Sequence, residues 1–263
     1  MLDSSVALEV AVGTRILAAF GLASGVRAGL GHVSMRVPGK PNHFVVKGRG
    51  YAVDSLATVK AADLVTCDLA GCLVDGPREV IPCFEVQIHA AIYKARPDVL
   101  SVAHAHPKFT TILSVLEKRI APMCNEGVRV VRHALPVYRH QKLVLSEEDG
   151  SELASVLGPE AAAVLMFGHG ATTTGKTVEE SVTAMLQLEH QAEMNYYASA
   201  MAGLDHPYVP DALIDEGLGS WGSMNQFGAQ YQLPHFKQAV AKAGMPKHNG
   251  AWGYWSQLVS RDL

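Results

Sequence analysis

Hydrophobic and polar residues form two kinds of pattern along this chain of 263 residues: helical spacing and short β-rich runs. Apolar side chains recur at helical spacing near the N-terminus, and similar patterns follow further on. Helices are therefore predicted over residues 5–23, 83–96, 108–116, 147–157 and 178–201. Short β-rich runs, several of them closed by glycine or proline, predict strands over residues 33–37, 44–47, 64–69, 99–106 and 163–167. Short strands with glycine turns favour an antiparallel sheet.

The periodic pattern of apolar residues becomes weaker after residue 204. Residues 205–263 are rich in Gly, Pro, Trp and Tyr and contain few long periodic runs. We therefore predict a catalytic domain over residues 1–204 and a C-terminal extension over residues 205–263. The extension is expected to pack on that domain or on a neighbouring subunit.

The amino-acid composition bears on which classes of protein this chain can belong to. Hydrophobic residues make up 48% of the chain and charged residues 18%, which suits a buried globular core. The net charge is −3 and the basic residues are scattered, so nothing favours binding to nucleic acid. Neither a signal peptide nor a membrane span is visible, and the four cysteines form no CxxC pair. We expect a cytoplasmic protein with no membrane contact.

Two histidines stand at the end of an apolar strand, in Ala-His104-Ala-His106-Pro107. Side chains at i and i+2 of a strand point to the same face, so both imidazoles emerge side by side. A divalent transition metal accepts such a pair. An isolated pair is equally compatible with two solvated histidines at a strand end.

A third histidine, His169, lies between Gly168 and Gly170 after another apolar run. Flanking glycines let the backbone turn tightly, so this imidazole can reach a crowded site. On its own a histidine in such a turn is more often a loop residue. Together with the pair at 104 and 106 it completes three nitrogen ligands and leaves positions open for water or substrate.

A carboxylate precedes this strand by one helix. Glu85 can bind the metal or carry a proton, although its position alone also suits a solvated first-turn glutamate. His89 follows four residues later on the same helical face.

The order of these motifs resembles the class II aldolase/adducin family. Glu85…His89…Tyr93 leads through Arg96-Pro-Asp98 to His104-Ala-His106-Pro, and then to Gly-His169-Gly. The similarity covers roughly residues 10–200. It implies an α/β/α three-layer fold around a central, mainly antiparallel sheet, and a homotetramer with active sites at subunit interfaces.

Carried over by position, the resemblance makes His104, His106 and His169 ligands of one divalent metal ion per subunit. Glu85 becomes the acid/base residue. The ion could be zinc, manganese or iron. Adducins are the non-catalytic branch of the family, and the full ligand set here favours an enzyme.

The sequence departs from the sugar-phosphate aldolases of this family at their phosphate-binding segments. Gly31-His32 replaces a Gly-Asn passage, Lys47-Gly48-Arg49 replaces a Ser-Gly turn, and Cys83-Phe84 replaces a Ser-Ser pair. Two cations and an aromatic ring suit a planar carboxylate better than a phosphorylated sugar. Arg49 can hold a carboxylate in bidentate fashion, and Lys47 adds a compact charge.

These features predict a metal-dependent lyase. The favoured reaction is non-oxidative decarboxylation of a hydroxylated aromatic or pyridine dicarboxylate, in the catabolism of aromatic compounds, through a metal-stabilised enolate. Glu85 or His32 would protonate the carbon, while the substrate contacts would come from Lys47, Gly48, Arg49, Phe84 and Tyr231. The alternatives are an aldolase for a non-phosphorylated 2-oxo acid or sugar, an Fe(II) oxygenase, and a non-catalytic adducin-like interaction module.

Overall fold

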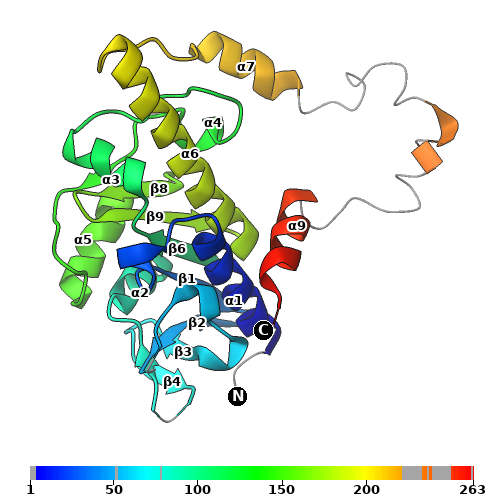
Figure 1. The fold of residues 1–263 in the computed structure, drawn as a ribbon. Helices are drawn as coiled ribbons and strands as arrows, with labels where there is room; N and C mark the ends of the chain where they lie inside the picture. The colour runs from blue at the N-terminus through cyan, green and yellow to red at the C-terminus, as the bar shows by residue number, and fades with distance from the viewer. Residues whose placement is uncertain are drawn as a thin grey trace.

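A computed structural model describes residues 4–50, 53–77, 79–220, 233–235, 237–238, 250–261 and 263. Its helices in chain order are α1 (Ser4–Ala19), α2 (Val86–Ala95), α3 (Lys108–Val115), α4 (Val128–Val131), α5 (Glu147–Leu157), α6 (Val178–Ala202), α7 (Asp211–Ser220) and α9 (Gly250–Val259). Three short 3-10 helices are η1 (Gly25–Arg27), η2 (Leu56–Thr58) and η3 (Ala61–Asp63). Figure 1 shows the longest of the helices, α6, running across the sheet.

One sheet contains all the described strands. These are β1 (His32–Val37), β2 (Lys40–Arg49), β3 (Leu64–Asp68), β4 (Leu73–Asp75), β5 (Ile81–Pro82), β6 (Ser101–Ala105), β7 (Val137–Tyr138), β8 (Ala163–Met166) and β9 (Gly170–Gly175). The order across the sheet is β4-β3-β2-β1-β6-β9-β8-β7, with β5 paired to β2. Neighbouring strands are antiparallel except β7 and β8, which are parallel.

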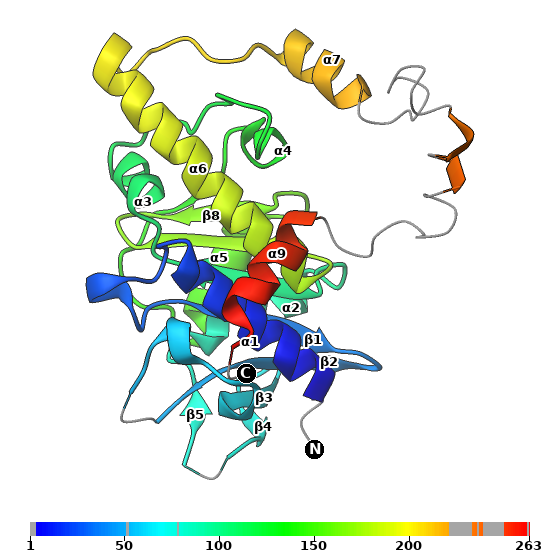
Figure 2. The ribbon, with the colours of Figure 1, turned by 45° about the vertical axis from the view of Figure 1, so that its right-hand side comes forward.

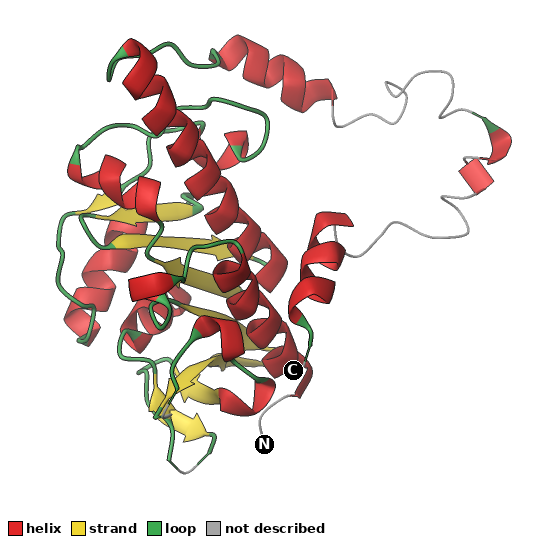
Figure 3. Cartoon of the chain, in the orientation of Figure 1, coloured by secondary structure: helices red, strands yellow, loops and turns green. Residues whose placement is uncertain are grey.

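Alternate residues of the strands face opposite layers of helices, as the two-residue period of a strand requires. On β6, Ala103 and Ala105 belong to the core cluster that also contains α1 and α6. Val102 belongs to the cluster that contains α2 and α5. Figure 3 shows these helices on the two sides of the sheet. The predicted α/β/α fold with a mainly antiparallel sheet is thus confirmed.

The structure differs from the sequence prediction at a few elements. Strand β9 was not predicted, because Gly170-Ala-Thr-Thr-Thr-Gly175 has little hydrophobic character, yet it lies inside the sheet between β6 and β8. The helix predicted from residue 83 begins at Val86, because residues 83–85 form a turn with Glu85 at the N-cap position. Helices α7 and α9 fall in the region where no regular element was predicted.

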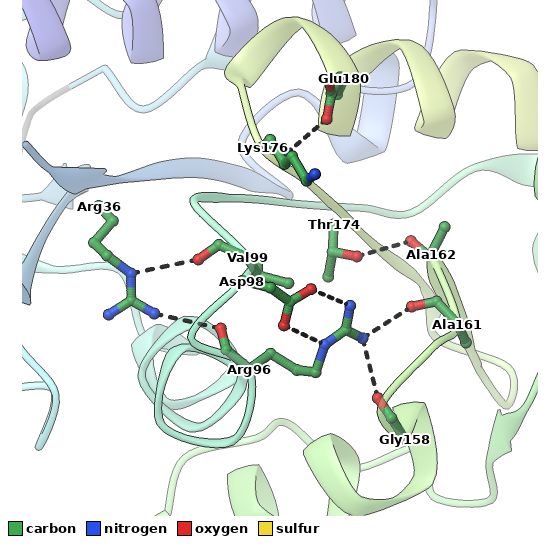
Figure 4. Close-up of polar contacts among 10 residues, drawn as sticks. All are labelled: Arg36, Arg96, Asp98, Val99, Gly158, Ala161, Ala162, Thr174, Lys176 and Glu180. Atoms are coloured by element: carbon green, nitrogen blue, oxygen red, sulfur yellow. Dashed lines mark hydrogen bonds and ion pairs between the residues drawn. The ribbon is translucent and has the colours of Figure 1, made fainter.

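The turn between α2 and β6 is held by several hydrogen bonds. It sets where β6, the strand that carries His104, begins. Arg96 holds both carboxylate oxygens of Asp98, at 2.9 and 2.7 Å, and also donates to the carbonyl of Gly158 at 3.1 Å. From β1, the Arg36 guanidinium donates to the carbonyl of Val99 at 3.3 Å. Figure 4 shows these contacts converging on the turn. Several charge-assisted bonds at one place restrict its geometry.

The end of the chain returns to the first helix. Helix α9 lies beside α1 in both ribbon views (Figures 1 and 2), and the rings of Trp255 and Phe20 are 5.2 Å apart. Arg15 of α1 donates to the carbonyls of Val259, at 3.0 Å, and of Arg261, at 2.6 Å. Helix α9 therefore packs against α1, while the division at residue 204 and the packing of the whole extension remain predictions. Within the described part, no helix is both long and apolar enough to cross a membrane.

Candidate metal centre and substrate pocket

Four side chains from three segments meet at one end of the sheet. His104 lies in β6 and His106 follows it, so both imidazoles point toward the α2 layer. Glu85 stands at the N-cap of α2, and His169 stands in the turn between β8 and β9. One potential ligand atom from each of the four lies within 4.8 Å of the others.

The distances within this cluster are short. The Nε2 atoms of His104 and His106 are 3.2 Å apart. The Oε2 atom of Glu85 lies 3.7 Å from Nε2 of His104 and 3.5 Å from Nε2 of His169. The other carboxylate oxygen of Glu85 accepts the backbone N–H of Val144 at 3.0 Å. Glu85 is therefore not the solvated first-turn residue that its position alone allowed, because its side chain is held toward the histidines.

Glycine permits the close approach that brings His169 into the cluster. A Cβ atom on Gly170 would lie 2.3 Å from the carbonyl oxygen of Ala105, a distance that no larger residue could tolerate. On the other side of the histidine, Gly168 has a φ of +64°, which favours glycine. The two glycines therefore allow the tight turn at His169 that the sequence predicted.

The cluster fits a divalent cation. Both ring nitrogens of His169 are buried without a hydrogen-bond partner, which is costly unless something else binds them. Two Nε2 atoms facing each other at 3.2 Å also share at most one proton, whereas both can donate lone pairs to one ion. His104 keeps its other nitrogen 3.2 Å from the hydroxyl of Thr172, a contact that orients the ring.

Burial and neighbouring charges keep the cluster in the protonation states of a ligand set. Burial would raise the pKa of Glu85, but the nearby His169 and His32 and the N–H of Val144 outweigh it and lower that pKa to about 2. Burial, with the neighbouring His169, lowers the pKa of His106 to about 4. The pKa of His104 is lowered well below its usual value, first by burial. Neutral imidazoles beside an ionised carboxylate are the forms that bind metals.

A pocket opens beside the cluster. It is lined by Gly29, Leu30, Gly31, His32, Lys47, Arg49, Cys83, Phe84, Glu85, His106 and Leu143. The pocket therefore gathers the two cations, the aromatic ring and the imidazole that replace the phosphate-binding segments. Gly48 lies between the cations in β2, where its backbone pairs with Pro82. Tyr231 lies outside the described residues, and its predicted role remains a prediction.

The two cations share a partner that the sequence reasoning missed. The carboxylate of Asp54 contacts Nζ of Lys47 and lies 2.6 Å from the guanidinium of Arg49. The same guanidinium stacks over the ring of Phe84, with 4.5 Å from its central carbon to the ring centroid. Lys47 is 1% exposed, so its charge is neutralised mainly through this contact. Asp54 belongs to no recognisable sequence motif, so nothing in the sequence marked it as a partner of the two cations.

His32 takes its place through strand pairing. It lies directly opposite His104 in the β1–β6 register, and the two rings stack with centroids 4.9 Å apart. Gly31 lets the strand begin there: its φ is +113°, and a Cβ would lie 2.8 Å from the carbonyl oxygen of His104. On its inner side, Nδ1 of His32 lies 2.6 Å from Nε2 of His89.

The sequence of this chain is similar to those of known proteins. The family described as Class II Aldolase and Adducin N-terminal domain matches residues 9–196, well over half of the chain. The chain belongs to this family. The resemblance seen in the sequence motifs is thereby confirmed.

Several similar curated proteins are named 3,4-dihydroxyphthalate decarboxylase. The one from Arthrobacter keyseri is 29% identical over 223 residues, which cover 82% of this chain and 87% of the relative. The one from Rhodococcus jostii (strain RHA1) is 26% identical over 243 residues, 89% of this chain and 94% of the relative. Gamma-adducin of Mus musculus is 30% identical over 214 residues, which are 80% of this chain but 30% of that protein.

Solved structures agree on the fold. An L-fuculose 1-phosphate aldolase from Glaciozyma antarctica PI12 superposes with a TM-score of 0.70 at 21% identity, covering 92% of this chain and 90% of that one. An aldolase II superfamily protein from Pseudomonas syringae gives a TM-score of 0.71 at 21% identity, covering 92% and 94%. These likenesses establish the architecture around the candidate site.

Proposed function

We propose that this protein is a metal-dependent carboxy-lyase that removes CO₂ from a hydroxylated aromatic or pyridine dicarboxylate. The observation that carries the proposal is the pair Lys47 and Arg49 in the same pocket as Glu85 and His106. The names of the two bacterial relatives, both decarboxylases of 3,4-dihydroxyphthalate, favour the same reaction. A role in the catabolism of aromatic compounds follows from that substrate class.

The two cations of the pocket suit a carboxylate. Lys47 and Arg49 together carry two positive charges, against the one negative charge of Asp54. An incoming carboxylate would compete with Asp54 for the guanidinium, which can hold it through two parallel N–H bonds. The Phe84 ring, 54% exposed, offers a flat apolar surface beside that guanidinium. Lys47 and Arg49 would then hold the carboxylate that stays on the ring.

His104, His106 and His169 would hold the divalent ion, with Glu85 beside it. Bound there, a divalent ion supplies Lewis-acid stabilisation of negative charge on a substrate oxygen. The Oε2 atom of Glu85 faces the ligand nitrogens and is the group best placed to take the proton of the ring hydroxyl. The bond between the ring and the departing carboxylate breaks, and CO₂ leaves. Glu85 then returns that proton to the ring carbon. His32 is the second candidate for this proton transfer.

The test is a substrate panel supplied to the purified protein with zinc, manganese or iron(II). We expect CO₂ release from 3,4-dihydroxyphthalate or a related hydroxylated dicarboxylate without oxygen uptake. Glu85→Gln should lower kcat at least about a hundredfold, as expected for the loss of a general acid–base residue. Glu148→Gln, a change of an exposed glutamate on α5, serves as the control and should leave kcat unchanged.

Other outcomes would select other functions. Aldehyde release from a 2-oxo acid or sugar would make the protein an aldolase, and oxygen uptake with iron(II) would make it an oxygenase. Failure to recruit any metal would leave an adducin-like interaction module. Full turnover in Glu85→Gln would contradict the proton-transfer role of that carboxylate. The predicted homotetramer belongs to the same proposal, and light scattering of the eluted protein tests it.

A further inference from the structure

A line of buried polar side chains leads from the pocket into the layer between the sheet and α2. Nδ1 of His32 lies 2.6 Å from Nε2 of His89, and Nδ1 of His89 lies 2.6 Å from Oγ of Ser34. The same Oγ lies 2.7 Å from the hydroxyl of Tyr93. All four side chains are at most 5% exposed. Each link is therefore a short hydrogen bond shielded from water.

The periods of strand β1 and helix α2 bring these four side chains together. His32 and Ser34 are alternate residues of β1 and share the face that looks toward α2. His89 and Tyr93 are one helical turn apart on α2 and share the face that looks toward the sheet. The Tyr93 ring is fixed by the Arg36 guanidinium, 4.6 Å from its centroid.

A second metal site is the competing explanation for part of this line. His32, Cys83 and His89 each offer a ligand atom within 4.8 Å of the others. However, both nitrogens of His89 already have partners. Two nitrogens on one tetrahedral zinc ion would also lie about 3.3 Å apart, farther than the 2.6 Å between His32 and His89. The geometry is that of hydrogen bonds.

We propose that His89, Ser34 and Tyr93 are positioning residues that hold His32 in one tautomer, with Nε2 directed to the pocket. The nitrogen of a histidine that carries the proton is set by the bond that the other nitrogen makes. If His89 donates from Nε2, His32 carries its proton on Nε2, toward the substrate; if His89 accepts there, the lone pair of His32 faces the substrate. Ser34 has a single hydroxyl proton, so it donates to His89 or to Tyr93 but not to both.

The consequence for catalysis rests on the proposed function, whereas the tautomer itself does not. Nδ1 of His32 is occupied by His89, so only Nε2 remains for the pocket that this ring lines. A ring that flips or exchanges tautomers would present the wrong atom for part of the time. Such a loss lowers turnover while leaving substrate affinity almost unchanged.

The experiment removes one hydroxyl and observes His32 directly. In the full chain labelled with ¹⁵N-histidine, long-range ¹H–¹⁵N spectra report the tautomer of each neutral ring, and a His32→Gln variant assigns the signals of His32. Wild-type protein should show one tautomer for His32. Tyr93→Phe keeps the ring and deletes the last hydroxyl, and Ser34→Ala deletes the middle one. Both should move the His32 signals toward the average of the two tautomers.

Tyr138→Phe is the matched control, because Tyr138 is equally buried in the α2–α5 layer and its hydroxyl lies 3.4 Å from Glu152, away from the line. It should leave the signals of His32 unchanged. In the decarboxylation assay, Tyr93→Phe should lower kcat about fivefold, the effect of one lost neutral hydrogen bond, and leave KM within about twofold.

Three results would overturn the proposal. The first is a His32 spectrum that neither Tyr93→Phe nor Ser34→Ala alters. The second is an equal loss of kcat in Tyr138→Phe. The third is a metal content of two ions per subunit that falls to one in Cys83→Ala. Should wild-type protein release no CO₂, the proposed function fails, but the tautomer spectra still decide the positioning role.

Discussion

Replacing Asp54 by asparagine should destabilise the protein by about 2 kcal/mol. Removing one partner of a buried ion pair costs about 3–5 kcal/mol, whereas an exposed pair contributes at most about 1 kcal/mol. Lys47 is nearly fully buried, but the side chains of Arg49 and Asp54 are 29% and 20% exposed, so an intermediate value applies. For a chain of this size, that loss lowers Tm by roughly 4–8 °C.

Thermal unfolding with and without phthalate measures this effect. Phthalate carries two carboxylates and no hydroxyl, so it is a non-reacting probe of the same cations. It should raise Tm of Asp54→Asn by more than it raises Tm of the wild-type protein, because it restores a carboxylate to Lys47 and Arg49. Glu147→Gln breaks the Lys94–Glu147 pair, whose side chains are 36% and 66% exposed, and should change Tm little. Equal Tm values for Asp54→Asn and Glu147→Gln, or no larger response to phthalate, would contradict the role assigned to Asp54.

Two further predictions concern the histidines. His104→Ala should abolish metal binding measured by elemental analysis, and it should remove the rise in Tm that added metal gives the wild-type protein; metal retained at one ion per subunit would contradict the ligand set. Burial lowers the pKa of His89 to about 3, so the unfolded chain binds that proton first as the pH falls below about 6.5. The metal-free protein should therefore lose stability from pH 6.5 toward pH 4. His89→Gln should reduce this slope by about 1.4 kcal/mol per pH unit, and an unchanged slope in urea unfolding would contradict the assignment.

Much of the site could be predicted because its histidines occupy positions that a strand period or a glycine turn places together. The i and i+2 positions of a strand put His104 and His106 on one face, and the turn at His169 was marked by glycines on both sides. Motif order then gave Glu85 a role that its position in the helix alone did not support. Regular periods likewise predicted most helices to within a few residues, since burial of one face determines them.

The rest depended on contacts between distant segments. Asp54 contacts Lys47 and Arg49 of β2, and no local sequence pattern encodes these contacts. Strand β9 has β-branched threonines that suit a strand but few apolar residues to mark it, and it pairs with β6 and β8 on either side. The line from His32 to Tyr93 required the register of β1 as well as the face of α2, and the sequence supplied only the latter.

The place of β9 inside the sheet links the candidate metal centre to the order of folding. His169 stands at the start of a strand whose long-range partner, β6, lies some distance earlier in the chain, so the ligand set is complete only after these distant strands have paired. Non-local pairing is the slow part of folding for such topologies. If the proposed ion binds there, it would bind tightly only to chains in which β9 has paired with β6, and its binding would stabilise that pairing.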